Sequence, residues 1–178
     1  MLVEFLAELF PRARLLPADP VSRAHARRFV ALFDAQYPPA FRAFFFSGGP
    51  AAGFLDMLAA LQARMHPARA GPALGGETEG EEEGEEEGEW SAWGFADLAV
   101  APFLVRVPML LENEFGTFPL GEGRKALEEL RGPRFERLMA YIERARAWPM
   151  FQKTYDEVRS FLSPRYGTEY GVCAGVYG

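Results

Sequence analysis

The sequence predicts an all-α protein, a bundle of five to six helices within a chain of 178 residues. Three observations predict this class. Apolar residues recur every three to four positions along most of the chain, and no window shows the strict alternation of a half-buried strand. Proline and glycine stand at the ends of these periodic stretches, where helices stop. The composition, 49% hydrophobic with 16 phenylalanines, supplies a large apolar core.

Residues 2–10 form the first expected helix, which Pro11 ends. Its polar side is marked by Glu4 and Glu8. A helix of fewer than three turns is marginal in water, so this one requires a surface to pack on. Its apolar face consists of Leu2, Val3, Phe5, Leu6 and Leu9.

Asp19 and Pro20 predict the start of the second helix, because a carboxylate can accept from the free amides and proline suits the first helical position. This helix continues towards residue 46, and Pro38 and Pro39 are expected to kink or split it. A third helix is expected over residues 51–69, with a buried face at Phe54, Leu55, Leu58, Leu61 and Met65.

The second half of the chain predicts four more helical stretches, over residues 95–111, 124–131, 133–147 and 151–162. In the third of these stretches the expected buried face is Phe135, Leu138, Met139, Ile142 and Ala145. We therefore expect residues 1–18 to be a helix and linker, residues 19–166 the helical domain, and residues 167–178 a glycine-rich flexible tail.

Residues 77–89 hold nine of the 25 carboxylates, so the net charge of −6 describes one segment rather than the whole chain. Without that segment, 16 acids face 19 bases. Like charges and glycine at this density predict a disordered surface loop over residues 70–90. Two interpretations of the loop stay open: an interaction tail for a basic partner, or a tolerated insertion between helices.

The residues that usually carry chemistry are few. One cysteine, Cys173, and two histidines, His25 and His66, exclude a disulfide framework and argue against a metal site. No segment has the pattern of a phosphate-binding loop or a nucleophile elbow, so no catalytic residue and no cofactor is expected. The arginines are dispersed, which argues against a nucleic-acid partner. No apolar run is long enough for a membrane span and no signal peptide is apparent, so a cytoplasmic protein is expected.

The segment WSAWGFADLAVAPFLVR has a conformationally free glycine, Gly94, and a carboxylate, Asp97, at an expected helix start. Asp97 stands three positions after Gly94, a spacing that lets the carboxylate accept from an amide near Gly94. Because the flanking residues are apolar, the carboxylate is expected to be buried and to need fixed partners. The sequence therefore predicts a structural half capping box at Gly94 and Asp97, rather than a catalytic group.

Four stretches together resemble a known family. They are VEFLAELFPRARLLPADPVSRAHAR, GFADLAVAPFLVR, the spacing of Asp97, Pro102 and Arg106, and PRFERLMAYIERARAWPMFQKTYDE. In this order they resemble the all-helical C-terminal domain of cytosolic glutathione transferases, most of all the omega-like and fungal branches. The resemblance extends over most of residues 2–166. The family normally has serine or threonine at the position of Gly94, so the hydroxyl half of the cap is missing.

The resemblance implies a helical domain that supplies the wall of an apolar substrate pocket and part of a dimer face. The pocket residues it implies are Tyr37, Phe41, Phe45, Phe103 and Arg106, with core packing as the alternative role for each. In the family, glutathione binds to a thioredoxin-like first domain, whose motifs are not found here. The chain alone is therefore expected to be inactive, with glutathione as co-substrate only where that domain is present.

A second interpretation is a non-catalytic interaction scaffold of the same fold. Under either interpretation, the first helix would lose the sheet that covers it in the family. Three possibilities stay open for what replaces this cover: a second copy of the chain in a homodimer, a different protein partner, or the first domain itself, encoded by a longer gene of which this is a part. The face that needs cover is Leu2, Val3, Phe5, Leu6 and Leu9.

Overall fold

The structure is a computed structural model that describes residues 2–13, 15–65 and 93–154, except for the side chains of Leu2 and Met150. Over these residues it contains α-helices and two short 3-10 helices, and no strand. The all-α prediction is confirmed. Cys173, His66, the acidic segment 77–89 and the predicted tail 167–178 lie outside the described residues.

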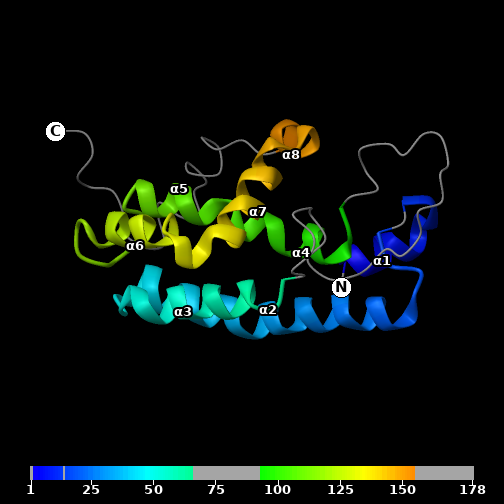
Figure 1. Cartoon of the computed structure of the whole chain (residues 1–178), viewed down its shortest axis with the longest axis horizontal. Helices are drawn as coiled ribbons and strands as arrows, with labels where there is room; N and C mark the ends of the chain where they lie inside the picture. The colour runs from blue at the N-terminus through cyan, green and yellow to red at the C-terminus, as the bar shows by residue number, and fades with distance from the viewer. Residues whose placement is uncertain (1, 14, 66–92, 155–178) are drawn as a thin grey trace.

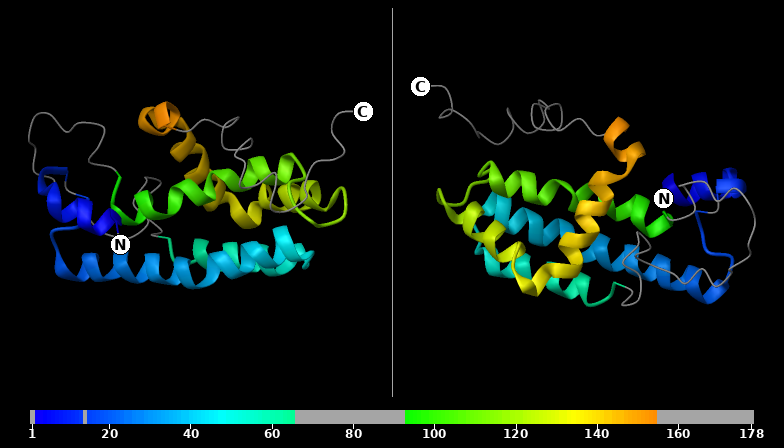
Figure 2. Two further views of the ribbon diagram at one scale, coloured as in Figure 1. Left: turned by 180° about the vertical axis from the view of Figure 1, so that it is seen from behind. Right: turned by 45° about the horizontal axis from the view of Figure 1, so that its top comes forward.

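The helices form two layers, one of which is built on the long helix α2 (Figure 1). Helix α2 runs along one side with α3 next to it, and α4, α5, α6 and α7 lie across them (Figures 1 and 2). The described α-helices are α1 (Leu2–Leu9), α2 (Pro20–Ser47), α3 (Ala51–Gln62), α4 (Phe95–Leu104), α5 (Arg106–Glu112), α6 (Glu122–Leu130), α7 (Glu136–Ala147) and α8 (Pro149–Thr154). The 3-10 helices are η1 (Pro11–Ala13) and η2 (Pro133–Phe135).

Helix α2 begins where the sequence predicts. The Ser22 amide donates to Asp19 Oδ2 at 2.7 Å, and Pro20 occupies the first helical position. Of the two outcomes expected at Pro38 and Pro39, a kink or a split, the split does not occur, because α2 is one helix of 28 residues. Both prolines lie on the exposed side, so their missing amides leave carbonyls that water can reach, while aromatic side chains hold the other side of the helix in the core.

The predicted helix over residues 95–111 is two helices, α4 and α5, and the bundle after residue 19 therefore has seven described helices rather than five to six. Pro108 explains the break. It has no amide to donate to the carbonyl of Leu104, so the regular ladder ends at that residue.

The remaining boundaries differ from the predictions by small amounts. Helix α3 ends at Gln62, whereas residues 66–69 of the predicted helix lie outside the described residues. Helix α6 begins two residues before the prediction, and α7 follows a 3-10 turn that opens at Pro133. Helix α8 is described as far as Thr154, so its predicted extension to residue 162 is not described.

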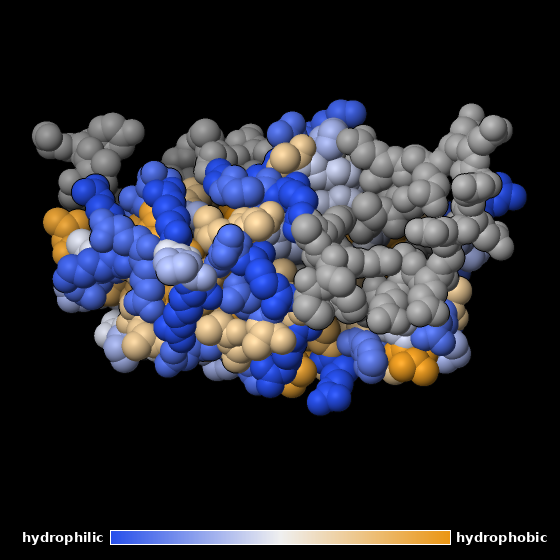
Figure 3. Space-filling view, in the orientation of Figure 1, coloured by the Kyte–Doolittle hydropathy of each residue, from blue (hydrophilic) through white to orange (hydrophobic). Residues whose placement is uncertain are grey.

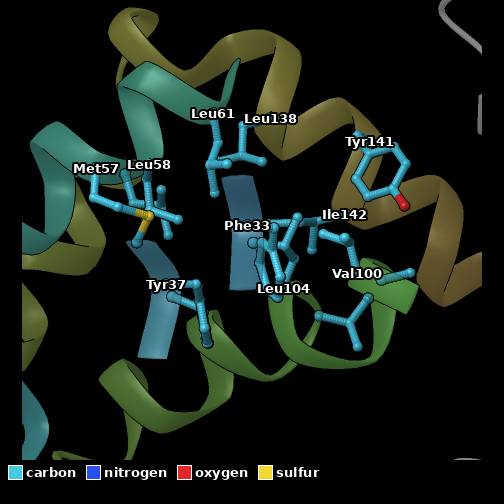
Figure 4. Packing of buried hydrophobic residues seen from close by; sticks show 14 of the residues in the cluster. Phe33, Tyr37, Met57, Leu58, Leu61, Val100, Leu104, Leu138, Tyr141 and Ile142 are labelled. Carbon is cyan, nitrogen blue, oxygen red and sulfur yellow. The ribbon is translucent and has the colours of Figure 1, made fainter. Parts of the chain in front are cut away.

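The core lies between the two layers, where side chains of α2, α3, α4 and α7 meet (Figure 4). Phe33 and Tyr37 from α2, Leu104 from α4 and Ile142 from α7 point into this space. The predicted buried faces of α3 and α7 are confirmed, with Met65 and Met139 only partly buried. Tyr141 is an addition to the predicted face of α7 and is fully buried.

Helix α1 packs on the bundle by one edge only. Val3 contacts the core, Ala7 is buried, and Arg27 on α2 forms an ion pair with Glu4 at 2.6 Å. The opposite side of α1 and the residue after it are exposed, with Phe5 at 59% and Leu9 and Phe10 each at 55%. Of the predicted apolar face, Phe5, Leu6 and Leu9 are exposed and Val3 is partly buried against the core, and a partner that covers this face stays a prediction.

Candidate ligand site at the junction of alpha2 and alpha4

A row of aromatic rings follows the inner side of α2 at helical spacing. Phe33 stacks on Tyr37 with ring centroids 4.6 Å apart, Tyr37 on Phe41 at 5.4 Å, and Phe41 on Phe45 at 4.3 Å. Residues four apart lie one above the other on a helix, so this spacing places all four rings in one column. The column gives α2 an almost continuous aromatic side.

Helix α4 adds Phe103 to this column. The Phe103 ring lies 5.6 Å from Phe33 and 5.9 Å from Tyr37, and the Tyr37 hydroxyl donates to the Phe103 carbonyl at 3.5 Å. Phe103 is 46% exposed, whereas Phe33 and Tyr37 are buried. At the junction of α2 and α4, the exposed ring of Phe103 therefore packs on the buried rings of Phe33 and Tyr37.

The structure brings four of the five predicted pocket residues into contact: Tyr37, Phe41 and Phe103 at the junction, and Phe45 further along the column. Phe45 has no exposed surface, because it is enclosed by Phe44 and Phe54 and by a ring from the α5–α6 loop. It packs the core. Arg106 begins α5 and is half-buried.

The predicted half capping box is present at the start of α4. The Gly94 amide donates to Asp97 Oδ2 at 3.0 Å, and the carboxylate has no exposed surface. The sequence did not predict a further donor to this carboxylate, Tyr141, whose hydroxyl donates to Asp97 Oδ1 at 3.2 Å. The available signal was the position of Tyr141, three residues after Leu138 and four before Ala145, which places it on the buried face of α7.

Burial raises the pKa of the Tyr141 hydroxyl well above its usual value, and the negative charge of Asp97 raises it further. The hydroxyl therefore stays protonated and remains a donor to the carboxylate. This arrangement links α4 to α7 and offers no nucleophile.

The other polar groups considered from sequence form no reactive cluster among the described residues. His25 lies exposed on α2. In the same part of the chain, no three histidine, cysteine or carboxylate side chains come together as they would around a metal ion. None of the described helices is long and apolar enough to cross a bilayer.

Comparisons with known proteins agree with this architecture. No family model and no curated protein matches the chain. Among solved structures it is similar to glutathione transferase Omega 1C from Trametes versicolor, with 29% identity and a TM-score of 0.72 over 94% of this chain. It is also similar to Omega 2S from the same organism, solved with 2,4-dihydroxybenzophenone, with 34% identity and a TM-score of 0.71 over 89% of this chain. A third match, Omega 2C, has 32% identity and a TM-score of 0.69 over 94% of this chain.

The chain spans only 62% of the length of Omega 1C and of Omega 2S, and 63% of Omega 2C. The match lies in the helical part of the glutathione transferase fold. The resemblance noted in the sequence is therefore confirmed: the described helices have the architecture of the all-helical domain of omega glutathione transferases.

Proposed function

We propose that these helices form the part of a glutathione transferase that holds the apolar co-substrate, at the junction of α2 and α4. The observation that carries the proposal is Phe103, an exposed aromatic ring fixed on the buried rings of Phe33 and Tyr37. Ligand sites for apolar molecules are lined by such rings with a few polar groups beside them. Tyr37 and Arg106 are the polar groups in this proposal, and Phe41 and Phe103 the apolar ones.

In this proposal the described helices contain no catalytic residue. Glutathione and the group that activates its sulfur would come from a thioredoxin-like domain, and the helices would act by holding the second reactant close to that sulfur. The 178-residue chain by itself is then expected to be inactive in conjugation. A cytoplasmic location is part of the same proposal.

The aromatic ketone present in the Omega 2S structure, 2,4-dihydroxybenzophenone, provides a probe for the site. We expect the purified chain to bind it in a calorimetric titration, and Phe103→Ala to weaken binding by roughly tenfold through the lost ring contact. Leu120→Ala is the matched control, because Leu120 is 92% exposed in the α5–α6 loop and lies outside the aromatic column. Equal affinities for wild type and Phe103→Ala would contradict the assignment.

A glutathione-affinity column tests the other half of the proposal. The chain is expected to pass through such a column, because no glutathione site is assigned to the helices. If the column retained the chain and free glutathione released it, the chain itself would bind glutathione. The proposal that glutathione binds to a thioredoxin-like domain alone would then be wrong.

The exposed side of α1 supports a second candidate function, a non-catalytic interaction scaffold. Phe5, Leu6, Leu9 and Phe10 together leave large apolar side chains in solvent, which is costly unless a partner covers them. On the face seen in Figure 3, by contrast, hydrophobic residues of the described helices are scattered among hydrophilic ones. We propose that a thioredoxin-like domain, a second copy of this chain or another protein covers α1.

Sedimentation of the purified chain separates these partners. A homodimer through α1 predicts a dimer for the wild type and a monomer for Leu9→Glu, with Glu8→Ala as the control on the polar side. A monomeric wild type would leave the cover to a different protein. A dimer that Leu9→Glu does not disturb would place the dimer face elsewhere, such as the outer side of α2 and α3.

A further inference from the structure

The start of α4 is held by two neighbouring amides that point to different parts of the molecule. The Gly94 amide donates to Asp97 Oδ2 at 3.0 Å, inside α4 itself. The next amide, that of Phe95, donates to the carbonyl of Leu15 at 2.7 Å, in the segment that follows α1. The two donors flank the backbone of Gly94, so a movement of this residue displaces both of them.

The same turn contacts the end of α7. The other oxygen of Asp97 accepts from the Tyr141 hydroxyl at 3.2 Å. Trp93, the residue before Gly94, stacks on Trp148 at the end of α7, with ring centroids 4.5 Å apart and planes inclined by 17°. Residues 93–97 thus lie between the segment after α1 on one side and α7 on the other.

The segment 2–16 is attached to the bundle at a few places. Val3 and Leu16 pack on the core, Ala7 is buried where α1 meets α4, and the ion pair from Arg27 to Glu4 is surface-exposed, a type of contact that contributes little. The bond from Phe95 to Leu15 adds a backbone attachment at the end of this segment.

We infer that Tyr141 is a positioning residue that controls, through Asp97 and the Gly94–Phe95 turn, how firmly residues 2–16 are attached to the bundle. Without the hydroxyl, a buried carboxylate keeps one donor fewer, and a hydrogen bond to a charged group is among the stronger ones. The carboxylate then shifts to recover its solvation, and the Gly94 and Phe95 amides turn with it. This coupling is independent of which protein covers α1, so it goes beyond the proposed function.

Amide hydrogen exchange of the full chain tests the inference, with Tyr141→Phe as the variant. We expect the amides of residues 6–13 and of Phe95 to exchange roughly tenfold faster, the change that a lost hydrogen bond to a charged group produces, while α3 is unchanged. Tyr37→Phe is the matched control. It also removes a buried hydroxyl, one that donates to the carbonyl of Phe103, and it should leave residues 6–13 unchanged.

Two results of that experiment would overturn the inference. One is an unchanged exchange rate over residues 6–13 in Tyr141→Phe. The other is an equal increase over α3, because this would indicate loosening of the whole bundle rather than of one attachment.

The reverse experiment changes α1 instead of α7, and so tests the coupling even where Tyr141→Phe does not fold. Coupling between two sites is reciprocal, so Val3→Ala, which shortens the α1 side chain that packs on the core, should speed the exchange of the Phe95 amide and change the near-ultraviolet circular dichroism of the stacked tryptophans. Glu8→Ala, on the exposed side of α1, is the control. No change at Phe95 in Val3→Ala would contradict the coupling.

Discussion

Four helices of this chain, α2, α4, α6 and α7, begin in two different ways. Helices α2 and α4 are capped by carboxylates a few residues away, Asp19 on the Ser22 amide and Asp97 on the Gly94 amide. Helices α6 and α7 have no such local cap. The carboxylate of Glu114 reaches forward across the α5–α6 loop to α6, and the side chain of Gln62 on α3 reaches α7.

The remote caps satisfy several groups each. Glu114 accepts from the amides of Gly121, Gly123 and Arg124 at 3.0, 3.3 and 2.9 Å. Gln62 accepts from the Leu138 amide at 2.8 Å and donates to the carbonyl of Arg134 at 2.7 Å. Helix ends need partners for their free amides, and the comparison shows that α2 and α4 use local contacts for this purpose while α6 and α7 use tertiary ones.

The largest expected effect is at Asp97. Asp97→Ala removes a fully buried carboxylate and leaves the Gly94 amide and the Tyr141 hydroxyl without their acceptor. We expect the free energy of unfolding to fall by about 3 kcal/mol, more than a simple cap contributes. Urea unfolding measures this, with Asp34→Ala on the exposed side of α2 as the control. A loss below about 1 kcal/mol would mean that the Tyr141 bond adds nothing to the cap.

Glu114→Ala tests a remote cap. The substitution leaves three amides at the start of α6 without their acceptor, so we expect a loss of about 2 kcal/mol in the same measurement. Glu112→Ala is the matched control, because Glu112 is exposed and has only a 3.9 Å contact to Arg131. If the two variants were equally stable, the remote cap would contribute no more than a surface carboxylate.

Asp19 should have a smaller effect, because it is exposed to solvent, and that effect should depend on pH. The hydrogen bond from the Ser22 amide lowers the pKa of Asp19 below its ordinary value of 3.8. A lowered pKa in the folded state stabilises the fold above pH 3.8, and this stabilisation disappears as the pH falls through the lowered value. The difference in stability between wild type and Asp19→Ala should therefore shrink in acid. A difference that grows below this pH would contradict the assignment.

The smallest expected effect has the opposite sign. Gly94 has φ −98° and ψ 179°, a backbone that any residue adopts, and a Cβ there would lie 3.6 Å from Asp97 Oδ2 and 3.7 Å from the Leu15 carbonyl. Gly94→Ser adds a hydroxyl that can accept from the Asp97 amide and complete the capping box. We expect a gain of a few tenths of a kcal/mol, visible as a higher melting temperature. Gly94→Ala, without the hydroxyl, is the control and should show no gain.

The same comparison explains what the sequence could predict. Asp19 and Asp97 act within three residues of their partners, so the pattern alone located both helix starts. Glu114 and Gln62 act through the tertiary structure, across 10 and 76 residues at their farthest, and a linear pattern does not encode such contacts. The aromatic column of α2 follows from its spacing, whereas the exposure of Phe103 and the burial of Phe45 depend on which neighbouring helix covers each ring.

The position of α2 in the chain has a consequence for synthesis on the ribosome. Its aromatic side is complete once residue 47 has been made, and α3 follows at once to cover Phe44 and Phe45. Phe54 of α3 also reaches Tyr37, but the contact of Phe103 with Phe33 and Tyr37 comes from a residue that lies 66 positions after Tyr37 and is translated correspondingly later. Until α4 emerges, the first half of the nascent chain carries an open aromatic surface, and we expect it to need a chaperone during that interval.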